Sequence, residues 1–100
     1  MTPEEIEEKL NVHVEKSFNG KWCFKYQFPL QELITVSNED KIKAASDFFV
    51  SFLKSLHYSI RALYENKMSD ELSSLIEKMQ QHNDPNINKT IQIVTRTMKL

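Results

Sequence analysis

The single glycine of this chain, Gly20, restricts the possible folds more than any other residue. It follows Asn19 and lies between two stretches rich in valine and aromatic residues. An Asn-Gly pair in this setting is typical of a β-hairpin turn, because glycine readily adopts the positive φ that such turns require. The sequence therefore predicts an antiparallel hairpin over residues 12–26.

The length of the hairpin loop decides which side chains face the core. A two-residue loop, Asn19-Gly20, would pair Val14 with Lys25 and would mix apolar and polar residues on both faces. A three-residue loop with Gly20 in a G1 bulge pairs Val14 with Phe24 and separates the two kinds of residue, so we predict this loop. The apolar face then comprises Val12, Val14, Trp22, Phe24 and Tyr26. The polar face comprises His13, Glu15, Ser17, Lys21, Cys23 and Lys25.

Two short elements are predicted on either side of the hairpin. Thr2 as N-cap and Pro3 as the first helical residue predict a short helix to about Leu10. Residues 30–36 fit either a third strand or a short helical turn, and the β-branched run Ile34-Thr35-Val36 favours the strand.

A long amphipathic helix is the strongest element that the sequence predicts. It starts with Ser37 or Asn38 as cap and continues to about residue 67. At 100° per residue, one broad apolar stripe forms the centre of the core. This stripe comprises Ile42, Ala45, Phe48, Phe49, Phe52, Leu53, Leu56, Ile60, Leu63 and Tyr64. A strip of small residues, Ser51, Ser55, Ser59 and Ala62, fits a solvated face or the seam of a homodimer.

Two further elements complete the chain. Residues 69–82 predict a second helix with Ser69 as cap and with Leu72, Leu75, Ile76 and Met79 buried. Residues 88–100 are rich in threonine, isoleucine and valine and predict a C-terminal strand. We therefore expect one small α+β domain over residues 1–100: a short helix, a hairpin with a possible third strand, two helices packed on the sheet, and a final strand.

The charge and cysteine content indicate a cytoplasmic protein without a membrane-spanning segment. The formal net charge is −1, which argues against a chain built mainly to neutralise phosphates or to lie on an anionic membrane. Cys23 is the only cysteine, so no internal disulfide is possible. The start of the chain is acidic, whereas a signal peptide would be basic and then apolar.

The patterns that mark enzymes are weak in this sequence. One glycine leaves no phosphate-binding loop of the dinucleotide or Walker type, and the three histidines are too dispersed for a metal signature. Cys23 and His13 share the polar face of the hairpin, and a thiolate–imidazole enzyme centred on them is an alternative. Without an orienting third group, a solvated strand face explains the pair better, so we expect no catalytic residue, no metal and no cofactor.

By elimination, the sequence favours a non-catalytic protein–protein interaction module, such as a small adaptor, regulator or inhibitor, with a homodimer as one form. The C-terminal run has no acid, glycine or proline, and an exposed strand of this kind invites pairing with another chain. We expect the partner-binding residues at the hairpin and in this run. They are Trp22, Lys21, Lys25, Ile91, Ile93 and Arg96.

The alternative partner is a nucleic acid. The predicted order of helix, hairpin, third strand and long helix is similar, in topology alone, to the double-stranded RNA-binding domain, whose helix start receives phosphate through lysines. Here Glu39 and Asp40 lie at that position and would repel phosphate. The basic residues for such binding would be Lys21, Lys25, Lys89, Arg96 and Lys99.

Overall fold

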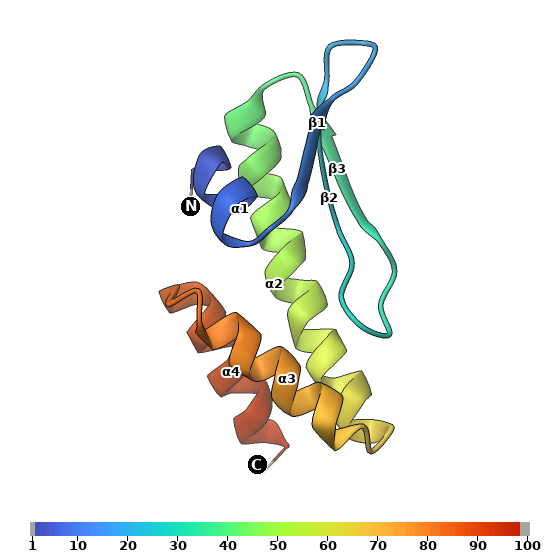
Figure 1. Cartoon of the computed structure of the whole chain (residues 1–100), viewed down its shortest axis with the longest axis vertical. Coiled ribbons are helices and arrows are strands. Elements are labelled where there is room, and N and C mark those ends of the chain that lie inside the picture. Colours follow the sequence, from blue (N-terminus) through green and yellow to red (C-terminus); the bar gives the residue numbers. More distant parts are fainter. Residues whose placement is uncertain (1, 99–100) are drawn as a thin grey trace. The chain divides into compact units, whose positions relative to one another are not determined.

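The structure, a computed structural model that describes residues 2–98, contains four helices and three strands in these residues (Figure 1). In chain order they are α1 (Pro3–Lys9), β1 (His13–Lys16), β2 (Trp22–Tyr26), β3 (Ile34–Asn38), α2 (Lys41–Glu65), α3 (Ser69–Gln80) and α4 (Pro85–Thr97). The strands form one antiparallel sheet in the order β1-β2-β3. The α+β class predicted from the sequence is confirmed.

Contacts within the chain divide it into two compact units. The sheet unit comprises the chain up to Gln27 together with Glu32–Phe52, and the helical unit comprises Phe28–Gln31 together with the chain from Leu53 onward. The helix α2 contributes its first half to the sheet unit and its second half to the helical unit. The expected single domain stays a prediction, and each unit is described separately below.

The hairpin has the predicted register. The amide of Ser17 donates to the Lys21 carbonyl at 2.7 Å, and the amide of Gly20 donates to the Ser17 carbonyl at 3.0 Å. Gly20 has φ +82°, and Val14 pairs with Phe24. These observations confirm the three-residue loop, in which only glycine adopts the required conformation without strain.

The third strand is confirmed, but it is shorter than expected. Only Ile34–Asn38 pairs with β2, because Pro29 and Leu30 form a turn in which the Gln31 amide donates to the Phe28 carbonyl at 3.2 Å. Leu30 has φ +61°, which no strand residue adopts.

The core of the sheet unit is aromatic. The Phe24 ring on β2 lies 5.7 Å from that of Phe48 on α2, and Phe48 lies 5.8 Å from Phe52. Tyr26 contacts Phe52 at 5.3 Å. One face of the sheet therefore packs on the first half of α2, and Ile6 and Leu10 from the N-terminal segment are also buried. The predicted cap of α1 is confirmed, because the Thr2 hydroxyl accepts from the Glu5 amide in a capping box.

The start of α2 differs from the prediction. The Asp40 carboxylate caps this helix by accepting from the amides of Ile42 at 2.9 Å and Lys43 at 3.3 Å, whereas the expected caps, Ser37 and Asn38, belong to β3. Ile42 is 72% exposed and therefore lies outside the core. Tyr64, also predicted in the apolar stripe, is exposed as well. The rest of the stripe is buried or half-buried as predicted.

The C-terminal segment is a helix, so the predicted C-terminal strand is wrong. The Asp84 carboxylate accepts from the amides of Asn86 at 2.9 Å and Ile87 at 3.0 Å, and Pro85 occupies the first helical position. Ile87, Ile91 and Val94 recur at helical spacing and are buried. The hydroxyls of Thr90, Thr95 and Thr97 donate to carbonyls in the preceding turn, at 2.9, 2.7 and 2.7 Å. Burial of one helical face has therefore outweighed the β-propensity of the segment.

The second half of α2 carries a buried serine that the sequence assigned to a solvated strip. The Ser59 side chain is fully buried, and its hydroxyl donates to the Pro29 carbonyl at 2.7 Å within the helical unit. In α3, Leu72, Leu75 and Met79 are buried as expected, but no side chain caps the helix at Ser69. Across residues 2–98, every helix is too short or too polar to cross a membrane.

Candidate functional site

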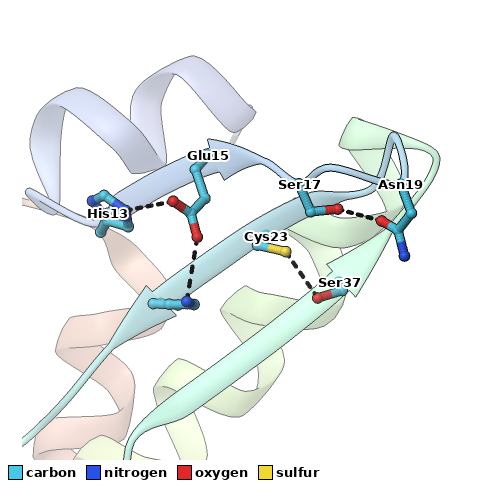
Figure 2. Close-up of polar contacts among 7 residues, drawn as sticks. His13, Glu15, Ser17, Asn19, Cys23 and Ser37 are labelled. Atoms are coloured by element: carbon cyan, nitrogen blue, oxygen red, sulfur yellow. Dashed lines mark hydrogen bonds and ion pairs between the residues drawn. The ribbon is translucent and has the colours of Figure 1, made fainter.

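The hairpin tip, defined as Lys16–Trp22, is a tightly hydrogen-bonded loop. Besides the two backbone bonds that close it, the Lys21 amide donates to the Ser17 hydroxyl at 3.2 Å and to the Asn19 side-chain oxygen at 3.4 Å. Figure 2 shows Ser17 and Asn19 pointing toward each other across the loop, where their side chains are hydrogen-bonded. These bonds hold the loop backbone and the Asn19 side chain, and they leave one loop side chain outside the network.

That remaining side chain is Phe18, which is completely exposed at 109% of its reference area. It is more exposed than any other large apolar side chain of residues 2–98. Single exposed apolar residues are common on protein surfaces, but most of them still bury part of the ring. Phe18 buries none of its area, so its contribution to folding through contacts is negligible.

Trp22 is the last residue of the tip, and two lysines approach its ring. It is half-buried, and the ammonium groups of Lys16 and Lys41 lie 5.6 and 4.4 Å from the centre of its ring. Ammonium groups at these distances attract the negative face of the ring. Trp22 therefore lies on the aromatic face of the sheet and also contacts the positively charged side chains of Lys16 and Lys41.

An open hollow of about 400 Å³ lies on the sheet next to Phe18. The thiol of Cys23 lies 3.1 Å from the Ser37 hydroxyl in this hollow (Figure 2). Lys21 is the one charged residue that lines it. The residues that line the hollow are Ser17, Phe18, Asn19, Lys21, Cys23 and Ser37.

The remaining polar face of the hairpin is occupied by a small ion-pair network. Glu15 accepts from His13 and from Lys25, each at 3.3 Å (Figure 2). The hydrogen bond with His13, then that with Lys25, lowers the pKa of the Glu15 carboxyl. Lys25, a predicted partner-binding residue, is therefore already paired. His13 contacts Glu15 and Cys23 contacts Ser37, so the structure does not show the thiolate–imidazole pair of the alternative enzyme hypothesis.

The six residues predicted to bind a partner are divided between the two units. Trp22, Lys21 and Lys25 belong to the sheet unit, whereas the other three lie on α4 in the helical unit. Ile91 is buried there at 4% exposure, and Ile93 is 46% exposed. The strand edge that these residues were expected to form does not exist, because α4 is a helix.

The basic residues of the nucleic-acid hypothesis also belong to different units, with Lys21 and Lys25 in the sheet unit. Lys89 and Arg96 lie on α4, and Lys99 lies outside the described residues. In residues 2–98, no three histidine, cysteine, aspartate or glutamate side chains lie close enough together to hold a metal ion.

Phe18 was missed as a candidate although the sequence contained the signal. The three-residue loop predicted from the register already places Phe18 at its first position, beyond the last paired residues of the hairpin. An aromatic residue in such a loop has no core to enter.

Comparisons with known protein families, with curated proteins and with solved structures found no match. The geometry and chemistry of the hairpin tip are therefore the observations that bear on function.

Proposed function

We propose that this protein is a non-catalytic protein-binding module of the cytoplasm, a small adaptor, regulator or inhibitor whose contact surface is the hairpin tip. The observation that carries the proposal is the complete exposure of Phe18 on a loop that its own hydrogen bonds hold in place. An aromatic side chain that buries no surface area in the free protein has its whole apolar area available for contact with a partner.

The energetics of Phe18 fit an interface anchor. Burying a phenylalanine side chain contributes about 1.5–3 kcal/mol, and residues that dominate interfaces insert into pockets within a rim of polar groups. Polar groups for such a rim are at hand, because Ser17, Asn19 and Lys21 line the same hollow as Phe18. A rigid loop also lowers the conformational entropy lost on binding.

The proposal is tested by replacing Phe18 with serine in the full chain. Proteins captured from the source cells are identified and purified, and their affinity is measured by calorimetry. Loss of the buried ring should weaken binding by about 10- to 150-fold, which corresponds to 1.5–3 kcal/mol. The thermal unfolding of Phe18→Ser should match that of the unsubstituted chain, since the ring has no contacts to lose.

The matched control is Tyr58→Ser, which removes another exposed aromatic side chain from a different unit. It should leave the affinity unchanged. Full retention of binding by Phe18→Ser, or an equal loss in both variants, would contradict the proposal. A second copy of the chain is one possible partner, and light scattering over a range of concentrations detects it.

A further inference from the structure

Three lysines at the hairpin tip and beside its Trp22 have no acidic partners within the described chain. Lys16 ends β1, Lys21 precedes β2 and Lys41 begins α2. No carboxylate of residues 2–98 forms an ion pair with any of the three, whereas Lys25 on the same hairpin is paired with Glu15. Lys16 and Lys41 approach the same Trp22 ring, so two like charges are held close together.

The acids close to these lysines in the sequence are outnumbered by basic residues. Glu15 is bound by His13 and Lys25, and Asp40 accepts the amides that begin α2. Residues 15–25 and 39–43 together contain five lysines against three acids, Glu15, Glu39 and Asp40. The hairpin tip and the start of α2 therefore carry an excess of positive charge, and the tip also carries the fully exposed Phe18 ring.

We infer that the hairpin tip binds an acidic segment of a partner protein, one in which aspartate or glutamate residues surround an apolar site for Phe18. This inference rests on the proposed function and specifies the chemistry of the partner. The hollow beside Phe18 matches it, because Lys21 is its one charged lining residue and the Ser37 hydroxyl offers a further polar group to a carboxylate.

An acidic protein fits this surface better than a nucleic acid does. The Asp40 carboxylate already occupies the start of α2, where a helix would otherwise receive a phosphate, and Glu39 lies beside it. A continuous phosphate backbone would have to pass both acids, whereas a few separate carboxylates on a protein need not. Three lysines are also few for phosphate-driven affinity but sufficient for the charged rim of a protein interface.

The test is a selection of phage-displayed random peptides on the immobilised full chain. The supporting result is enrichment of peptides that combine aspartate or glutamate with apolar residues. Their affinity in solution should fall at least about tenfold when Lys16, Lys21 and Lys41 are all changed to glutamine. It should also fall with added salt, because exposed charges are screened. Lys54→Gln is the matched control: it removes the same charge from an exposed position of α2 in the helical unit and should have no effect.

The outcomes distinguish the two proposals. Enriched peptides that need Phe18 but lack acids, or that ignore the three lysine substitutions and salt, overturn this inference and leave the proposed function standing. A selection that yields no Phe18-dependent peptide overturns both. Lysine-dependent binding of short RNA or DNA duplexes, or of phosphatidylserine vesicles, in place of acidic peptides also overturns both and assigns the surface to that ligand.

Discussion

At the scale of single residues, His82 is the side chain whose protonation the fold opposes. Its Nε2 atom is buried and has no hydrogen-bond partner in residues 2–98. Burial lowers the pKa of His82, the positive charge of Lys78 lowers it further, and Asp84 acts in the opposite direction. The neutral form is therefore favoured in the folded protein more than in the unfolded chain.

This shift predicts a loss of stability as the pH falls. Above the unfolded pKa of about 6.5, His82 is neutral in both states and contributes no pH dependence. As the pH falls through that value, the unfolded chain takes up a proton before the folded protein does, so the free energy of unfolding decreases until the folded pKa is passed. Urea unfolding over this range should show the decrease in the unsubstituted chain and a smaller one in His82→Gln.

A control variant and the pH range distinguish the effect of His82 on stability from the effects of other titratable groups. His13→Gln alters an exposed histidine and should keep the decrease that His82 causes. Glu5 and Glu15 have pKa values lowered from 4.5, so their contributions are lost at a more acidic pH. Identical pH profiles for the His82→Gln variant and the unsubstituted chain would show that His82 is not the responsible group.

At the scale of elements, α4 depends on its N-cap. The Asp84 carboxylate satisfies two amides that would otherwise lack partners at the start of this helix. Asp84→Ala should lower the free energy of unfolding by about 1 kcal/mol. Urea unfolding measures the change at a pH well above the pKa of His82, because Asp84 also influences that group.

Asp47→Ala is the control for this prediction. Asp47 is exposed within α2 and caps no helix, so its replacement should change stability by less than about 0.5 kcal/mol. A larger loss from Asp47→Ala than from Asp84→Ala would contradict the assigned cap.

The elements also differ in how far local sequence determines them. The hairpin, the cap of α1 and most of the α2 stripe were predicted, because turn chemistry and side-chain period act over a few residues. In α4, local signals conflict: Asp84 and Pro85 indicate a helix start, whereas Ile91, Ile93 and Val94 have high β-propensity.

At the scale of the whole molecule, the division into two compact units predicts unequal local stability. Ile87→Ala, on α4 in the helical unit, removes a fully buried side chain and should cost about 2–4 kcal/mol. Native-state hydrogen exchange should then accelerate more for amides of α3 and α4 than for those of β2.

Phe24→Ala is the reciprocal variant. It removes the buried ring of β2 from the sheet unit and should reverse the pattern of acceleration. Equal acceleration throughout the chain in both variants would contradict separate units and would instead indicate one cooperative domain, as predicted from the sequence.

The sequence alone determined the hairpin register and the long helix, since each follows from interactions between near neighbours, and it favoured the third strand over a helical turn. Only the tertiary structure decided the rest. Residues 85–97 became a helix because one helical face is buried, and Ser59 became a core residue because the Pro29 carbonyl lies against it. Phe18 stands out as a candidate anchor because no part of the described chain covers it. The solvent exposure of a side chain is a property of the folded molecule.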